Sequence, residues 1–196
     1  MTDKRTITAY DSQIDNYLEI LKKQPEDQRL LNFIAKFKPH DYVLDLGCGP
    51  ASASMIMQEH GLRVDPVDAS LEMVNLANAV FNIGARQAAF EDIDTIDTYD
   101  GVWANFSLLH ATPEEFPIIL AALKQALKSS GVFQLCMKAG EGSRRDKFDR
   151  LYSYYSQEEL ASHLGKAGFM VEKVELGEVR GMAGDIEPWI ALTAIA

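Results

Sequence analysis

An apolar strand that runs into a glycine turn is encoded by Val43-Leu44-Asp45-Leu46-Gly47-Cys48-Gly49-Pro50. Glycines at positions 47 and 49 let the backbone turn sharply and approach a ligand closely, while Asp45 at the strand end can organise the loop and favour a cation nearby. Dinucleotide-binding proteins share such a turn, but Ser52 stands where their third glycine would be, which disfavours a bulky pyrophosphate. The stretch therefore predicts a ligand that needs no phosphate binding.

Short β-type segments alternate with segments of helical period around this turn. The strand-like segments are 42–46, 63–67, 86–90, 101–105 and 132–137. This alternation is typical of crossover units on a parallel sheet, so the sequence predicts a parallel α/β domain. Near the end of the chain, segments 169–176 and 189–195 have no long helix between them and predict an antiparallel pair.

Two helices are expected ahead of the first strand. Tyr10, Tyr17 and Leu21 fall at helical spacing, and Pro25 opens a second helix that ends near Pro39. Residues 1–40 would then form a helical cap on a core of residues 41–196. Because no linker, repeat or low-complexity tract is visible, we expect a single domain.

Composition limits the classes of partner. The chain has 196 residues, of which 47% are hydrophobic, and a formal net charge of -10 that would repel nucleic acid and anionic membranes. Cys48 and Cys136 lie in apolar contexts that suit reduced core thiols, and the N-terminus is too polar for a signal peptide. We expect a cytoplasmic monomer or homodimer that binds neither nucleic acid, membrane nor metal.

Acidic positions follow the next two predicted strands. Asp68 ends the second strand, where a carboxylate can accept hydrogen bonds from both hydroxyls of a ribose. Glu91-Asp92-Ile93 ends the third, where an acid followed by an apolar residue can accept from an adenine amino group and pack the ring. The simpler alternative for Asp68 is an acid at the N-terminus of a helix, and that for Glu91-Asp92-Ile93 is a solvated acidic turn. In register with the glycine turn, the two signals favour an adenosine ligand.

With these motifs the chain resembles the class I S-adenosylmethionine (SAM) dependent methyltransferases, and closely their small-molecule methyltransferase-domain group. The resemblance covers about residues 41–196 and includes Asp68-Ala69-Ser70 and 99–105 besides the two motifs above. It implies a Rossmann-like α/β fold with a seven-stranded, mostly parallel sheet in the order 3-2-1-4-5-7-6, strand 7 antiparallel, and helices on both faces. One departure is Ser129-Ser130, where these enzymes commonly carry Pro or Gly.

The resemblance also implies a cofactor site for SAM. The backbone at Gly47 and Asn105 would face the methionine moiety, Asp68 would bind ribose, and Asp92 and Ile93 would hold adenine. The full set of expected cofactor residues is Tyr10, Asp45, Gly47, Cys48, Gly49, Asp68, Ala69, Met73, Glu91, Asp92, Ile93, Asn105, Phe106 and Ser107.

Three further residues are candidates for the chemistry. His110 leaves the fourth strand at the carboxyl edge of the sheet, where it either orients substrate and takes a proton or is satisfied by local backbone groups. The connection 138–155 gathers basic and tyrosine side chains that can hold an anionic or polar small molecule, or that form a solvated loop with internal ion pairs. Lys138 and Tyr154 are the expected acceptor contacts, because they lie nearest the strand end and the next helix.

The resulting functional expectation is a SAM-dependent methyltransferase that acts on a small-molecule acceptor by direct in-line displacement. A SAM-binding protein without catalysis stays open. A nicotinamide-dependent oxidoreductase is opposed by the missing third glycine and by the absence of a Tyr-x-x-x-Lys pair. The leading helix with Tyr10-Asp11 either packs permanently on the core or forms a lid over the cofactor.

Overall fold

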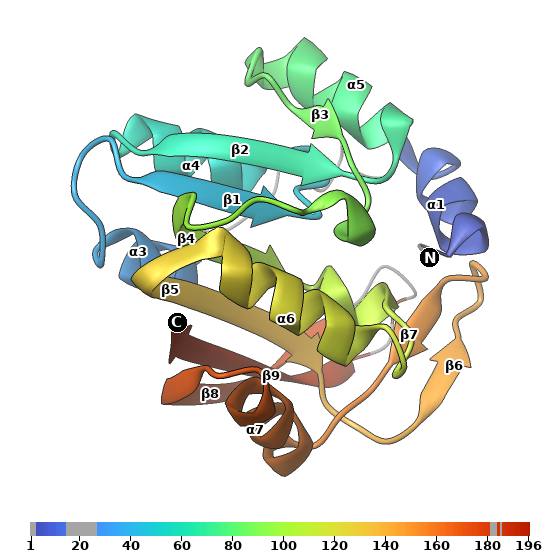
Figure 1. The fold of residues 1–196 in the computed structure, drawn as a ribbon. Coiled ribbons are helices and arrows are strands. Elements are labelled where there is room, and N and C mark those ends of the chain that lie inside the picture. The colour runs from blue at the N-terminus through green and yellow to red at the C-terminus, as the bar shows by residue number, and fades with distance from the viewer. Residues whose placement is uncertain (1–2, 15–26, 181–183, 185) are drawn as a thin grey trace.

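Helices and strands alternate along the chain in the computed structural model, which describes residues 3–14, 27–180, 184 and 186–196 (Figure 1). In chain order the elements are α1 (Lys4–Asp11), α3 (Gln28–Ile34), β1 (Tyr42–Leu46), α4 (Ser52–Glu59), β2 (Arg63–Asp68), α5 (Leu71–Phe81), β3 (Arg86–Gln87), the 3-10 helix η1 (Phe90–Asp92), β4 (Tyr99–Asn105), the 3-10 helix η2 (Leu108–His110), α6 (Phe116–Ala126), β5 (Leu127–Lys138), β6 (Ser143–Arg145), β7 (Leu151–Ser153), α7 (Gln157–Lys166), β8 (Met170–Arg180) and β9 (Ile186–Ile195).

Seven of the strands form one sheet in the order β3-β2-β1-β4-β5-β9-β8. β1 to β5 run parallel to their neighbours, whereas β9 is antiparallel to both β5 and β8. β6 and β7 pair as a separate hairpin outside this sheet. If only the seven strands of this sheet are numbered in chain order, β8 and β9 become strands 6 and 7. The order is then 3-2-1-4-5-7-6 with strand 7 antiparallel, so the predicted fold is confirmed.

The sheet is buried on both faces because side chains alternate along each central strand. Leu44 packs in a cluster with residues of α6 and α7, while its neighbour Val43 packs with Phe33 of α3 and Met57 of α4. In Figure 1, α6 lies in front of the sheet and α4 behind it. Packing between these two layers holds the strand ends in place, and the candidate site described below lies at those ends.

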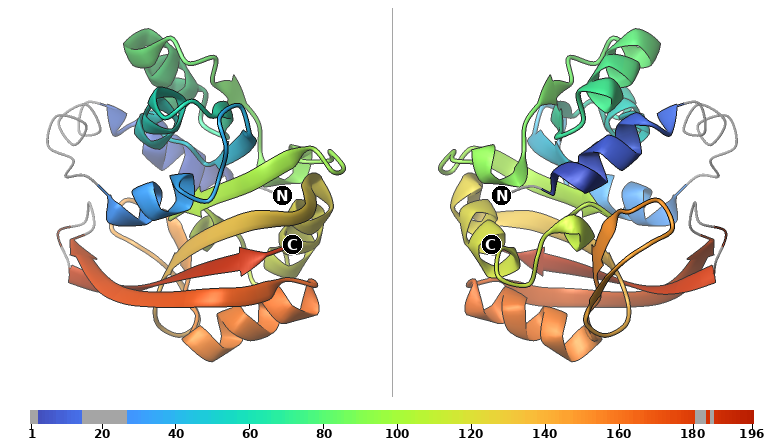
Figure 2. Two further views of the ribbon diagram at one scale, coloured as in Figure 1. Left: turned by 90° about the vertical axis from the view of Figure 1, so that its left-hand side faces the viewer. Right: turned by 90° about the vertical axis from the view of Figure 1, so that its right-hand side faces the viewer.

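The carboxyl edge of the sheet is covered by two elements that are distant in sequence. The right-hand view of Figure 2 shows α1 and the β6-β7 hairpin lying across this edge. The hairpin was not expected from the sequence, which indicated only a basic connection there. Tyr10 lies in α1, which ends at Asp11. Tyr17 and Leu21 of the predicted leading helix, and Pro25, which opens the predicted second helix, lie outside the described residues.

Two boundaries differ from the expectation. β3 contains only Arg86 and Gln87, because the chain turns into η1 and the Asp92 carboxylate accepts a hydrogen bond from the Ala89 N–H at 2.8 Å. β5 begins at Leu127, directly after α6, whereas the expected strand segment began at residue 132. Within the described residues, no helix is long and apolar enough to cross a membrane, and no cluster of three or more His, Cys, Asp or Glu side chains could hold a metal ion.

Candidate functional site

A cavity of about 390 Å³ lies at the carboxyl edge of the sheet, lined by strand ends of the core and by α1. The expected cofactor residues that line it are Tyr10, Asp45, Gly47, Cys48, Gly49, Asp68, Ala69, Met73, Asn105, Phe106 and Ser107. Residues that the sequence did not single out also line it, among them Ala53, Ala88, Phe90, Trp103, Arg150 and Tyr152. Positions scattered over the chain therefore converge on one space.

Glycine is needed at position 47 because another loop passes close to it. Gly47 has a φ of +73°, and a Cβ built there would overlap the Cβ of Ser107 in the loop after β4. The Gly47 N–H donates to the Val67 carbonyl at 2.8 Å. The close approach thus joins two loops of the protein, whereas the sequence argument expected an approach to the ligand. Gly49, with a φ of +52°, has nothing within 4 Å of such a Cβ.

Asp68 ties the second strand to the glycine turn. Its Oδ2 accepts from the Gly49 N–H at 2.8 Å and its Oδ1 from the Ser70 N–H at 2.9 Å. Burial raises the pKa of this carboxyl, although both backbone hydrogen bonds oppose the rise. Each carboxylate oxygen has a second acceptor position, so Asp68 can still accept hydrogen bonds from a ligand in the cavity.

Asp45 is a buried acid at the end of β1. It accepts a hydrogen bond from the Ser54 hydroxyl, and burial raises its pKa to about 7, with the charge of Asp68 adding to the rise. Two polar atoms nearby on the cavity wall, Asn105 Oδ1 and Ser107 Oγ, are buried without a hydrogen-bond partner among the described residues. Such orphaned groups are costly, so this end of the cavity suits a polar or cationic ligand group.

The predicted adenine contacts are displaced by the turn at η1. Glu91 and Asp92 are exposed, and Ile93 is buried in the core, so none of the three lines the cavity. Ala88 and Phe90 line it instead. The aromatic residue at position 90 is the sequence feature that could have identified this lining residue, because an adenine ring packs well against an aromatic or apolar surface.

His110 lies between Tyr10 and Tyr152 in the cavity wall. Its Nδ1–H donates to the Leu151 carbonyl at 2.6 Å, so its Nε2 accepts from the Tyr10 hydroxyl at 2.7 Å. Burial, together with the charges of the nearby Arg150 and Lys138, lowers the pKa of His110 to about 4. In this arrangement His110 is neutral and its acceptor nitrogen is engaged, so it does not present a free base.

Two buried cations complete this part of the cavity wall. Lys138 lies over the Tyr152 ring, 3.9 Å from its centroid, and pairs with the Glu187 carboxylate. Arg150 pairs with Asp146 at 2.6 Å and lies 5.3 Å from the same ring. Both cations line the cavity.

Tyr154 does not line the cavity, in contrast to the expectation. It lies one residue beyond the end of β7, packs on Gly140, and donates its hydroxyl to Glu187 at 3.2 Å. Arg144 covers its ring at 3.9 Å. Tyr152, inside the strand, takes the place in the cavity wall that the sequence argument gave to Tyr154.

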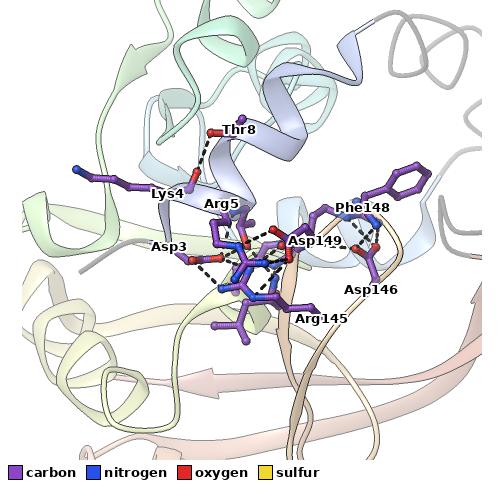
Figure 3. A network of polar contacts seen from close by, with 12 residues as sticks. Asp3, Lys4, Arg5, Thr8, Arg145, Asp146, Phe148 and Asp149 are labelled. Carbon is purple, nitrogen blue, oxygen red and sulfur yellow. Dashed lines mark hydrogen bonds and ion pairs between the residues drawn. The ribbon is translucent and has the colours of Figure 1, made fainter.

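The β6-β7 hairpin is joined to α1 by ion pairs and hydrogen bonds (Figure 3). Arg145 donates to both carboxylate oxygens of Asp3, at 2.9 and 3.0 Å, and Arg5 makes a two-point contact with Asp149. α1 thereby closes the cavity from one side.

Comparison with known proteins supplies the family. Residues 43–131 match a family model described as "Methyltransferase domain". These residues, a little under half of the chain, are similar to a methyltransferase domain. The matched residues run from β1 into β5 and contain the glycine turn, Asp68 and His110. Tyr10, Lys138 and the hairpin lie outside them, so the cation-lined part of the cavity wall is formed largely by parts of the chain beyond the matched residues.

Two curated relatives of this methyltransferase domain illustrate its range. An uncharacterised methyltransferase of Staphylococcus carnosus is 26% identical over 118 residues, which cover 60% of this chain and 56% of that protein. The cypemycin N-terminal methyltransferase of a Streptomyces species is 31% identical over 133 residues, which cover 64% of this chain and 54% of that protein. The chain thus spans little more than half the length of these relatives.

Solved structures of methyltransferases share the fold over most of the chain. A SAM-dependent methyltransferase of Methanosarcina mazei superposes with a TM-score of 0.75 at 17% identity, covering 88% of this chain and 98% of that one. The 1,6-didemethyltoxoflavin-N1-methyltransferase of Burkholderia thailandensis, with bound 1,6-didemethyltoxoflavin and S-adenosylhomocysteine, gives 0.74 at 23% identity, covering 97% and 87%. The predicted resemblance to class I methyltransferases is confirmed for the domain and its fold.

Proposed function

We propose that this chain is a SAM-dependent methyltransferase that transfers the methyl group of SAM to a small-molecule acceptor by direct in-line displacement. One observation carries the proposal: the cavity at the carboxyl edge of a methyltransferase domain combines Asp68, the glycine turn and two orphaned buried oxygens in one wall. Ligands of open α/β folds bind outside the carboxyl ends of the strands, where this cavity lies.

The residues on this wall fit SAM. Asp68 would accept the ribose hydroxyls, and Asp45, Asn105 and Ser107 would take the ammonium and other polar atoms of the methionine moiety. Phe90 and Met73 would pack the adenine ring, in place of Asp92 and Ile93. Bound SAM supplies a methyl group that is already activated by its sulfonium sulfur. The protein then has to orient the acceptor and exclude water, and α1 is placed to do both.

A small molecule is the acceptor that suits the cavity. Its volume of about 390 Å³ lies within the range of small-molecule sites, and α1 and the hairpin enclose it. The Burkholderia thailandensis neighbour acts, by its name, on a small heterocycle, whereas the cypemycin relative modifies an N-terminus. The acidic composition and the free thiols of Cys48 and Cys136 support a cytoplasmic location.

Calorimetric titration tests the cofactor assignment. S-adenosylhomocysteine and SAM should bind the wild-type protein, and NAD should not. Asp68→Ala should weaken binding by about 1.5 to 3 kcal/mol, because a charge-assisted pair of hydrogen bonds is lost. Glu72→Ala is the matched control, since Glu72 is an exposed acid in the first turn of α5. Equal affinity in the wild type and Asp68→Ala would show that the cofactor binds elsewhere.

A further inference from the structure

One part of the cavity wall is formed by Tyr10, His110, Lys138, Arg150 and Tyr152, hereafter the acceptor cluster. These five side chains contact one another: Tyr10 bonds to His110, and Tyr152 is covered by both cations. We propose that the methyl acceptor is an anionic small molecule and that Lys138, with Arg150 beside it, binds its negative charge. This inference rests on the proposed function and adds the chemical class of the acceptor.

The charges on the cavity wall divide by position. The charged residues that line it are Asp3, Asp45, Asp68, Lys138 and Arg150. Asp45 and Asp68 belong to the strand ends of the cofactor wall. Asp3 is neutralised from outside, because Arg145 donates to both of its oxygens. Among the residues that the structure describes, only cations therefore remain to act on a ligand at the acceptor cluster.

Lys138 keeps a hydrogen-bond donor for a ligand. An ammonium group has three N–H donors. Among the described residues, that of Lys138 contacts one carboxylate, Glu187, and the ring face of Tyr152. At least one N–H is thus left on a side chain that is only 8% exposed and lines the cavity. A buried donor of this kind favours an anionic partner, which gives it a charge-assisted hydrogen bond.

The counter-ions of both cations lie outside the cavity wall. Glu187 pairs with Lys138 and Asp146 pairs with Arg150, but neither carboxylate lines the cavity. Burying an unpaired cation would cost several kcal/mol, so such carboxylates are needed to keep the cations charged before a ligand arrives. The arrangement turns the positive side of each ion pair toward the ligand.

The remaining basic residues of the 138–155 connection are not part of this surface. Arg144 covers Tyr154, Arg145 pairs with Asp3, and Lys147 is exposed, and none of the three lines the cavity. The sequence suggested the whole basic segment as a binding element. Of the basic residues in that segment, Lys138 and Arg150 are the two that line the cavity.

The acceptor cluster also contains no free base, which suits an acceptor that arrives with its own charge. His110 accepts from Tyr10 through Nε2 and is kept neutral by burial and by the two cations. A neutral amine or alcohol would have to lose a proton during methyl transfer, and no side chain of the cluster is poised to take it. An acceptor whose nucleophilic atom itself carries the negative charge, such as a carboxylate or a thiolate, needs no such step.

Binding of matched anionic and neutral probes tests the inference. Benzoate and phenyl phosphate, with benzamide and phenol as their neutral counterparts, are titrated into the protein saturated with S-adenosylhomocysteine. We expect at least one anion to bind, with its neutral counterpart about tenfold weaker or more, and Lys138→Met to remove this preference. Lys147→Met, which removes an exposed lysine of the same connection, should leave it unchanged.

The variants are chosen to keep the readouts separate. Lys138→Met leaves Glu187 without its close partner. If the single variant has a lowered melting temperature, the double variant Lys138→Met with Glu187→Gln replaces it. Lys138→Arg should retain the preference for the anion. Equal affinity for anion and neutral counterpart, no anion binding at millimolar concentration, or an unchanged preference in the folded Lys138 variants would overturn the inference. Loss of S-adenosylhomocysteine binding in the wild type would instead overturn the proposed function on which it rests.

Discussion

Gly47 and Gly49 share one turn and left-handed backbones, but they are glycine for different reasons. At Gly47 a side chain would collide with Ser107, which brings the loop after β4 against the glycine turn. At Gly49 the space is open, and only the backbone angle favours glycine. The N–H of Gly49 matters more, since it holds Asp68 in place.

Alanine at each position should separate these roles. Gly49→Ala should cost about 1 to 2 kcal/mol of unfolding free energy, because an alanine must adopt a left-handed conformation. Gly47→Ala should cost about 2 kcal/mol more and also weaken S-adenosylhomocysteine binding, because the Ser107 loop has to move. Urea unfolding and calorimetry measure both quantities. Equal losses in the two variants would mean that the Gly47–Ser107 contact is unimportant.

Asp45 should make stability depend on pH. Its folded pKa is raised by burial to about 7 from an ordinary 3.8, so the folded state binds more protons than the unfolded state between these values. Stability from this group is therefore lost as the pH rises through that window. Asp45→Asn keeps an acceptor for Ser54 and cannot ionise, so it should gain stability relative to wild type between about pH 5 and about pH 8. A difference in melting temperature that stays constant over this range would contradict the assignment.

At the scale of elements, α1 and the β6-β7 hairpin form a clamp across the cavity. Asp3–Arg145 and Arg5–Asp149 join the two, and Asp11 at the end of α1 accepts from the Ser70 hydroxyl that caps α5. α1 has only eight residues, and an isolated helix of that length is unstable in water. Its position therefore depends on these contacts.

Removing one contact should loosen the clamp measurably. Arg145→Met should raise hydrogen exchange in residues 3–14 and weaken S-adenosylhomocysteine binding about fivefold, close to 1 kcal/mol for a partly buried two-point pair. Lys36→Met, which breaks the exposed pair with Glu172 on another side of the fold, is the control. Binding of the product should in turn protect residues 3–14 from exchange. If neither the substitution nor the ligand changes hydrogen exchange in residues 3–14, α1 has only a packing role.

The same scale explains which expected site residues line the cavity. The glycine turn and Asp68 are local signals, fixed by strand ends that hydrophobic alternation locates well, and both line the cavity, while their role toward a cofactor stays a prediction. Ile93 is buried in the core and Phe90 lines the cavity instead, because β3 ends at Gln87 and the 3-10 helix η1 begins at Phe90. Tyr152 rather than Tyr154 reaches the cavity because a hairpin with long-range contacts to α1 sets its position, and no local pattern encodes those contacts.

At the scale of the whole molecule, the residues that match the methyltransferase family model supply one part of the cavity wall and the rest of the chain supplies the other. The matched residues 43–131 contain the glycine turn and Asp68, whereas α1, Lys138 and the hairpin complete the acceptor cluster. Such a division lets one cofactor site serve different acceptors through changes in the surrounding segments. It also means that cofactor binding alone does not establish catalysis.

Transfer of labelled methyl from SAM is the measurement that tests the central claim most directly. The wild-type protein is incubated with methyl-labelled SAM and a metabolite extract fractionated by charge, and labelled products are identified by mass spectrometry, with Asp68→Ala as the control. A labelled small molecule from the anionic fraction, formed by the wild type and strongly reduced in Asp68→Ala, is the predicted result. SAM that binds but labels no small molecule would contradict the account, because the cavity would then serve a binding protein without methyl transfer.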